Sequence, residues 1–347
     1  MTMAFLASAA LVHAAPRWRD ILEQPPDWYG SAEARATARI VQTYQTAIGG
    51  WPKNLDMTRP PSAPVDVAES TIDNGATTTQ LWLLGRIISA PGGDPDAVLR
   101  IAAERGIDYL LAAQYPNGGW PQFFPLRRGY YSHITFNDDA MVRVLRVLQA
   151  VAEQREPFGW VDPARRERAA AAVARGVECI LRCQVRVEGQ LTAWCAQHDA
   201  ETFAPAPARK FEPISLSGME SVGILEFLMA QPASPELVAA IEAGVAWLDR
   251  VKLTGWRIER PPLPDGSGRD LVLVKAAEDA PPVWARFYEI GTDRPIFMGR
   301  DGVAYDNLAA VEPERRSGYA YYGTWGASLL AKAYPQWKAR RAAPEVK

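Results

Sequence analysis

The sequence QTAIGGWP at residues 45–52 returns as QYPNGGWP at residues 114–121 and, with more divergence, as QVRVEGQLTAW at residues 184–194. Each copy has a Gln at the end of a helical stretch, a turn that contains glycine, and a Trp after the turn. Glycine commonly ends a helix because it adopts the left-handed conformation without strain, and the Trp can then fold back onto the helix end. The three tryptophans are 69 and 74 residues apart, about the length of two helices with their loops. The repeat therefore predicts helix pairs around an axis, an (α/α) toroid whose loops gather at one mouth, rather than an irregular helical bundle.

Helical periodicity also dominates the rest of the chain. Apolar residues recur at three- and four-residue spacing, and Pro-rich stretches separate the helices as loops. Short strands are predicted only at residues 271–276, 284–290 and 294–300, which are too few to build a sheet protein. The fold class is therefore mainly α, an (α/α) toroid or barrel of helix pairs with a few short β-strands. The helices are predicted at residues 31–45, 74–88, 94–114, 137–154, 163–184, 217–229, 235–251 and 324–333.

The composition limits the kinds of partner and cofactor. A formal net charge of −2 gives no electrostatic reason to expect a nucleic acid or a membrane as a partner. Three cysteines cannot form a complete disulfide set, and three histidines supply little for zinc sites or His-based triads. Twelve Trp and twelve Tyr suit a carbohydrate-binding groove, although aromatic side chains also fill cores.

Residues 1–15, MTMAFLASAALVHAA, have the pattern of a secretory signal peptide without its basic first segment. The apolar run is too short to cross a bilayer, and small residues suited to cleavage follow it. A frayed N-terminal extension is the alternative. We expect residues 16–347 to form a single (α/α) toroid domain that is secreted or periplasmic and monomeric.

Acidic and amide side chains cluster at two predicted helix starts, each at a similar distance after a Trp of the repeat. They are Asp73 and Asn74 in IDNGATTTQ (72–80), and Asn137, Asp138 and Asp139 in HITFNDDAM (133–141). Any of them could cap a helix N-terminus, but the runs hold more oxygen atoms than a cap needs. Adjacent carboxylates repel unless a cation lies between them, and such oxygen ligands favour Ca²⁺. The pattern therefore predicts a calcium site at the mouth of the toroid.

Basic residues gather in two later stretches. They are Arg209 and Lys210 in ARKFEPISLSGMES (208–221), and Arg286, Arg294 and Arg300 in ARFYEIGTDRPIFMGRDG (285–302). A single surface Arg is usually only solvated, but Arg-rich loops opposite paired acids would bind an anionic ligand together with a cation. The acids could instead form a glycoside hydrolase pair. Against that reading, the positive end of a helix dipole lowers a carboxyl pKa, which suits a metal ligand better than a general acid.

Eight stretches, in this order, make the chain resemble the family 10 polysaccharide lyases, which are pectate lyases. They are GGWPKNLDM, TIDNGATTTQ, NGGWPQFFP, ITFNDDAM, WCAQHD, ARKFEPISLSG, PIFMGRDG and SGYAYYGTW. The match covers about residues 18–333, and the set is specific although no single stretch is. The resemblance implies an (α/α) toroid and the Ca²⁺-dependent β-elimination of α-1,4-linked galacturonan, so that the partner would be polygalacturonate or pectin.

The resemblance also implies roles for single residues. Asp73 and Asp138 would bind the calcium ion, and Asn74 beside them would serve the substrate. His198, in WCAQHD, would orient a ligand or pack against its neighbours.

Four basic residues receive roles in the same way. Arg209, with Lys210 beside it, would bind a uronate carboxylate, and Arg286 would bind the carboxylate next to the cleavage site. Arg300 would be the catalytic base that removes the C5 proton, giving a 4,5-unsaturated product. Because guanidinium is normally protonated, we expect neighbouring cations and partial burial to lower the pKa of Arg300.

Two other function classes remain open from the sequence. A toroidal glycoside hydrolase would release saturated ends and need no metal. A non-catalytic pectin-binding protein would keep the Trp and Arg groove but would tolerate the loss of Arg300.

Overall fold

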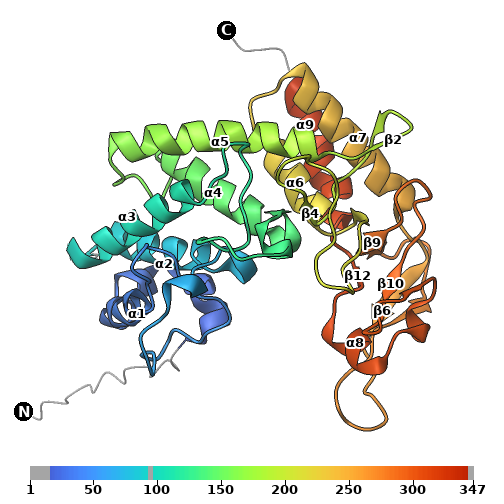
Figure 1. Cartoon of the computed structure of the whole chain (residues 1–347), viewed down its shortest axis with the longest axis horizontal. Coiled ribbons are helices and arrows are strands. Elements are labelled where there is room, and N and C mark those ends of the chain that lie inside the picture. The colour runs from blue at the N-terminus through green and yellow to red at the C-terminus, as the bar shows by residue number, and fades with distance from the viewer. Residues whose placement is uncertain (1–15, 93–96, 343–347) are drawn as a thin grey trace, which may run out of the picture.

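The computed structural model describes residues 16–92 and 97–342 (Figure 1). The predicted signal peptide, residues 1–15, lies outside these described residues. Across the two described ranges, no helix is both long enough and apolar enough to cross a membrane.

The helices form two sets that alternate along the chain. The outer set is α1 (Ala32–Thr43), α3 (Ala97–Ala112), α5 (Pro163–Cys183) and α7 (Pro235–Val251); the inner set is α2 (Thr78–Ser89), α4 (Ala140–Ala152) and α6 (Glu220–Leu228). Inner helices pack against one another in the order α2, α4, α6, and each also packs against the outer helix that follows it. In Figure 1 the first helix, α1, and the last, α9 (Tyr334–Ala342), lie far apart, so the ring is open. The predicted mainly α fold with helix pairs is confirmed.

Three glutamines join successive helix pairs in the same way. The side-chain amides of Gln45, Gln114 and Gln184 each donate one hydrogen bond within their own turn and one to a carbonyl of the next outer helix. The second acceptors are Ala102, Ala172 and Ala240, each at 2.8–2.9 Å. The glutamine of the sequence repeat is therefore a tie between neighbouring repeats.

The tryptophans of the repeat fold back onto the helix that precedes them, as predicted. Their indole N–H groups donate to the carbonyls of Val41, Leu110 and Ile180, each at 2.8 Å. Each indole also lies against a glycine of the next outer helix, namely Gly106, Gly176 and Gly244, where a Cβ atom would collide with the ring or with a core Leu. These glycines permit the close packing that places one repeat on the next.

A fourth tryptophan completes the series, and the sequence analysis did not identify it. Trp284 donates from its indole nitrogen to Leu248 of α7 at 2.9 Å, and Gly326 packs against its ring. The long insertion between α7 and Trp284 disguises this fourth turn, because it carries no Gly-Gly-Trp signature.

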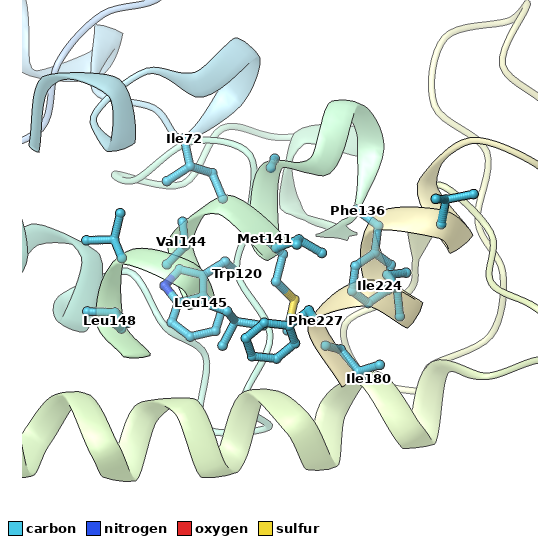
Figure 2. Packing of buried hydrophobic residues seen from close by; sticks show 14 of the residues in the cluster. Ile72, Trp120, Phe136, Met141, Val144, Leu145, Leu148, Ile180, Ile224 and Phe227 are labelled. Carbon is cyan, nitrogen blue, oxygen red and sulfur yellow. The ribbon is translucent and has the colours of Figure 1, made fainter. Parts of the chain in front are cut away.

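The core lies between the inner and outer helices. Helix α4 is its centre, since ten of its thirteen residues are buried. Figure 2 shows Met141 and Leu145 of this helix packed between Trp120, Ile180 of α5 and Phe227 of α6. Truncating a side chain such as Leu145 to Ala would cost about 2–5 kcal/mol of folding stability. This packing fixes where each inner helix starts.

The two kinds of connection differ greatly in length. Each passage from an outer to an inner helix is long, at residues 44–77, 113–139 and 184–219, whereas residues 153–162 and 229–234 return from inner to outer helices. The long loops therefore meet the N-terminal ends of the inner helices at one face. They contain the 3₁₀ turns η3 (Val67–Glu69), η4 (Asp73–Gly75), η5 (Tyr130–Ser132) and η6 (Asn137–Asp139).

Short antiparallel strand pairs connect these loops. β1 (Ile134–Thr135) pairs with β4 (Gln197–His198), β5 (Leu216–Ser217) with β9 (Phe287–Tyr288), and β8 (Trp284–Ala285) with β12 (Tyr322–Gly323). The other pairs are β2 (Arg186–Val187) with β3 (Gln190–Leu191), β6 (Trp256–Glu259) with β7 (Val272–Lys275), and β10 (Phe297–Met298) with β11 (Ala304–Tyr305). The first three join loops of different repeats.

The remaining elements lie at the two ends of the described chain. The N-terminal part has the 3₁₀ turns η1 (Trp18–Glu23) and η2 (Pro26–Gly30), and the C-terminal part has η7 (Leu308–Ala310) and α8 (Pro313–Gly318). The helix predicted at residues 324–333 is wrong in extent, because a π-helical turn, η8 (Leu329–Ala333), continues into α9. The helix therefore continues beyond Ala333, the predicted end, and passes through Pro335, because the π turn comes just before the proline.

Candidate functional site

The starts of α2 and α4 have the same unusual backbone. In η4, Asn74 has φ 51° and ψ 31°; in η6, Asp138 has φ 51° and ψ 34°. The next residues, Gly75 and Asp139, also have positive φ, at 75° and 60°. Asn74 is thus the structural counterpart of Asp138. Left-handed Asn and Asp residues are often found where a site holds the backbone in strain.

The capping interpretation does not hold for these residues. Neither α2 nor α4 has a side-chain hydrogen bond at its N-cap, and the side chains of Asp73, Asn74 and Asp138 point to other partners. Their oxygens are therefore not used to complete the helix starts.

Asp73 is buried and forms an ion pair with Lys53. Its second oxygen, Oδ1, is buried without a hydrogen-bond partner. Asn74 is exposed and donates from Nδ2 to Asn54 Oδ1 at 2.9 Å. The sequence analysis missed Lys53, although GGWPKN places it two residues after a Trp of the repeat.

Arg286 joins three segments that are far apart in the sequence. One of its terminal nitrogens donates to Asn137 Oδ1 at 3.2 Å, to Asp138 Oδ1 at 2.9 Å and to Glu220 Oε1 at 2.5 Å. Arg286 follows Trp284 by two residues, as Lys53 follows Trp51. In two of the repeats, the residue two positions after the Trp is therefore a cation that pairs with the acids at a helix start.

Burial and charge act in opposite directions on Arg286. Burial disfavours the guanidinium, but the carboxylates of Glu220 and Asp138 outweigh it, so the pKa of Arg286 is raised above its ordinary value. Removing one partner of a buried pair such as Arg286–Glu220 typically costs about 3–5 kcal/mol. Arg286 is consequently a fixed positive charge at the mouth.

Glu220 is the second residue that the sequence analysis missed. It is fully buried at the first residue of α6, where its backbone N–H donates to Ser217 Oγ at 3.0 Å and its carboxylate accepts from the same hydroxyl. The spacing Ser217-x-x-Glu220 is that of a capping box. That pattern was the available signal, but it predicts a helix start and does not predict a partner 66 residues away.

Asp139 lies behind this group. Its carboxylate packs against Gly223 of α6, and burial, together with the charge of Glu220, raises the pKa of Asp139 to about 6. The charges of Arg143 and Arg146 act in the opposite direction on Asp139 but do not outweigh its burial.

Three of the five predicted basic residues form a second group beside Phe211. The guanidinium groups of Arg209 and Arg300 lie 4.8 and 5.2 Å from the centre of the Phe211 ring. Lys210 lies against Gly302 in the neighbouring loop. The structure thus brings Arg209, Lys210 and Arg300 together, although the first two are some 90 residues from the third.

Carboxylates hold both arginines of this group. Arg209 donates to Glu212 from two nitrogens, at 2.9 and 2.5 Å, and Arg300 to Glu314 at 3.1 and 2.8 Å. The hydrogen bonds to Glu314 raise the pKa of Arg300. This direction is opposite to the expectation that its surroundings lower that pKa.

Tyr319 and a buried arginine connect the two groups. The Tyr319 ring lies under Arg286, at 4.9 Å, and under Arg315, at 3.8 Å from the ring centre. Arg315 also faces Phe211, at 4.3 Å. The aromatic stack therefore sets the spacing between the acidic helix starts and the basic loops.

His198 occupies a different environment from the other predicted residues. Its ring is fully buried, Nε2 accepts from the backbone N–H of Cys195 at 3.1 Å, and Nδ1 donates to Phe203 O at 2.8 Å. Burial lowers the pKa of His198 to about 4. In the next repeat Tyr288 OH accepts the equivalent bond, from Ala285 N–H at 2.9 Å, so the imidazole supports the loop and reaches a ligand only indirectly.

The oxygens at the starts of α2 and α4 fit a Ca²⁺ ion. The turns η4 and η6 pack against each other, and Asp73 Oδ1 is a buried acceptor without a partner. Among residues 16–92 and 97–342, no group of three His, Cys, Asp or Glu side chains forms a metal cage. An ion held here would therefore need further oxygens from water or a ligand, which Ca²⁺ accepts readily.

Comparisons with known proteins found a matching family model and similar solved structures. A family model described as pectic acid lyase matches residues 45–330. A solved family 10 polysaccharide lyase from Cellvibrio cellulosa is 36% identical, with a TM-score of 0.78 over 90% of this chain and 96% of that chain. A mutant of the family 10 polysaccharide lyase from the same organism, in complex with trigalacturonic acid, matches equally well over 91% and 98% of the two chains. A search of curated protein sequences found no significant match.

Proposed function

Because this chain belongs to the pectic acid lyase family and is a polysaccharide lyase, we propose that it cleaves α-1,4-linked polygalacturonate by calcium-dependent β-elimination. The products would be oligogalacturonates with a 4,5-unsaturated end. The hydrolase and the non-catalytic binding protein are set aside by the family.

One observation carries the proposal most directly. Arg286, Asp138 and Glu220 come from three repeats and meet at the starts of the inner helices, with 2.9 and 2.5 Å between the guanidinium and the two carboxylates. A fixed cation beside an exchangeable acid is suited to a ligand that is itself a carboxylate with a bound metal ion. A galacturonate unit carries such a carboxylate, and a mutant of the Cellvibrio relative was solved in complex with trigalacturonic acid.

The basic residues would bind and orient the polymer. Arg286 pairs with the carboxylate of the sugar whose C5 proton is lost, and stabilises the negative charge that develops there. Arg209 and Lys210 bind the carboxylate of another unit, and Asn74 contributes hydrogen bonds beside Asp73. A calcium ion held by Asp73 and Asp138 would supply further neutralisation of the same charge.

Arg300 is the proposed base. In its neutral form it takes the C5 proton, the C5–H electron pair forms the C4–C5 double bond, and the C4–O bond breaks toward the leaving sugar. The Glu314 pair opposes this role, but it is a surface pair with side-chain exposures of 47% and 71%, and such pairs are weak. Binding of the polyanion can therefore open it. Arg209 flanks the same Phe211 ring and is the competing candidate.

The test follows product absorbance in the ultraviolet, where the conjugated double bond absorbs. When the protein is incubated with polygalacturonate at alkaline pH, we expect the absorbance to rise in the presence of CaCl₂ and to stop rising when EDTA is added. The kcat and KM of Arg300→Ala and Arg209→Ala are measured over a range of substrate concentrations up to saturation: loss of the base lowers kcat by roughly 10²-fold or more, whereas loss of a binding residue raises KM. A kcat defect in Arg209→Ala alone would reassign the base.

The remaining parts of the proposal concern the whole protein. We propose that residues 16–347 act as one monomeric catalytic domain outside the cytoplasm, because a polysaccharide too large to cross a membrane must be met there. Size-exclusion chromatography and fractionation of the producing cell test these two points.

A further inference from the structure

Two carboxylates accept hydrogen bonds from Arg286, and they differ in their exposure to solvent. Glu220 is 0% exposed, whereas the Asp138 side chain is 36% exposed. Glu220 also accepts the backbone N–H of Asp138 at 3.1 Å. One partner is thus locked inside the protein and the other faces the ligand.

The orientation of Glu220 is fixed by its own helix. Its Oε2 atom accepts the Ser217 hydroxyl, and that hydroxyl accepts the backbone N–H of Glu220 at 3.0 Å. Ser217 belongs to β5, which is paired with β9 next to Arg286, and Gly218 N–H donates to Arg286 O at 3.0 Å. The carboxylate and the backbone of Arg286 are therefore attached to the same short segment.

Asp138 must change partners in the proposed reaction. When Asp138 turns to a cation or a sugar, Arg286 loses one of its carboxylates while it stays buried, at 4% exposure. A buried guanidinium without a counter-charge is strongly disfavoured. Some other group must hold Arg286 at that moment.

We infer that Glu220 is a positioning residue for the elimination: it keeps the Arg286 guanidinium at the mouth when Asp138 is used by the ligand. Glu220 does not touch the substrate and acts only through Arg286. The inference rests on the proposed function, and on Arg286 as the group that meets the reacting carboxylate.

The first test is Glu220→Gln, which keeps the size and removes the charge. We expect kcat to fall roughly 100-fold, the usual effect of losing one charge-stabilising donor. The matched control is Glu226→Gln on the same helix, where the carboxylate pairs with exposed Arg146 at 3.2 Å. That variant should keep the wild-type kcat.

The second test separates positioning from a general structural role. In the Arg286→Ala background, Glu220→Gln should lower kcat no further, because the residue through which it acts is gone. The double variant removes both buried charges together, so it should fold even where Glu220→Gln alone is unstable. Where rates fall below detection, the same comparison is made with the Kd for trigalacturonic acid by calorimetry.

The outcomes decide the inference in either direction. Agreement of the double variant with Arg286→Ala within about twofold, the normal limit of additivity, supports it. A Glu220→Gln enzyme with wild-type kcat, or a double variant in which the two losses multiply, overturns it. Absence of lyase activity in the wild type would instead refute the proposed function, and would be seen before any variant is compared.

Discussion

Three outer helices of this toroid begin differently from the inner helices α2 and α4. At the starts of the outer helices α1, α5 and α7 a side chain closes the helix: Ser31, Asp162 and Ser234 accept backbone N–H groups at 3.0–3.2 Å. At the inner starts of α2 and α4 there is no such cap, and the backbone passes through left-handed residues. The same types of residue therefore serve opposite purposes in the two places.

The difference shows how the core supports a site. At an outer start the polar oxygen is used up by the helix that follows. At an inner start, burial of the whole helix stabilises it, so that the oxygens of Asp73 and Asp138 remain available. Thr77, with φ 64°, shows the strain that this requires, since a β-branched residue rarely adopts positive φ. The Thr77 hydroxyl accepts the backbone N–H of Trp51 at 3.0 Å and donates to the carbonyl of Thr71 at 2.9 Å, and these bonds hold Thr77 in this conformation.

The largest effect is expected at an inner start. Asp138→Ala should lower kcat/KM by roughly 10²–10³-fold, because it removes a proposed calcium ligand and the exchangeable partner of Arg286. The Tm should change little, because Asp138 caps no helix and Glu220 still pairs with Arg286. Initial rates and thermal unfolding on the same sample check both points. An Asp138→Ala variant that keeps its activity but loses stability would instead show that Asp138 is an ordinary helix cap of α4.

A pH-dependent effect is expected beneath the mouth, at His198. Burial holds its pKa at about 4, below the unfolded value of about 6.5. The unfolded chain therefore takes up the proton first as the pH falls, and stability is lost between about pH 6.5 and 4, by up to about 3 kcal/mol. His198→Gln can keep both hydrogen bonds without titrating, so its stability should fall less over that range. Denaturant unfolding at several pH values measures this.

The control for that experiment is His133→Gln. His133 is only partly buried, so its substitution should flatten the pH dependence less. An identical pH dependence in His198→Gln and wild type would show that His198 does not titrate on unfolding.

The smallest effect is expected at an outer start. Ser234→Ala should cost about 1 kcal/mol of folding stability, because it removes the cap of α7, and should leave kcat and KM unchanged. Ser234→Asp restores a capping oxygen and should recover the stability. Reduced activity in a folded Ser234→Ala enzyme would show that this outer helix start also contributes to function, contrary to the distinction between the two kinds of helix start.

Local patterns predicted much of this fold. Helical periodicity and the Gln–Gly–Trp repeat are local signals, and each corresponds to a bond that the structure contains, such as Gln114 to Ala172. The predicted helix end at Ala333 is wrong, because the π turn at Leu329–Ala333 continues directly into α9. The fourth Trp was missed because a long insertion separates it from its helix.

The helix pairs, their order and the two acidic stretches could be predicted from the amino-acid sequence, because they depend on spacing within a few residues or on the Gln–Gly–Trp repeat. Only the tertiary structure decided which acid faces which cation. Lys53 with Asp73, and Glu220 with Arg286, are pairs from loops 20 and 66 residues apart. No local pattern encodes such pairs, since they follow from how the buried repeats stack and where each inner helix then begins.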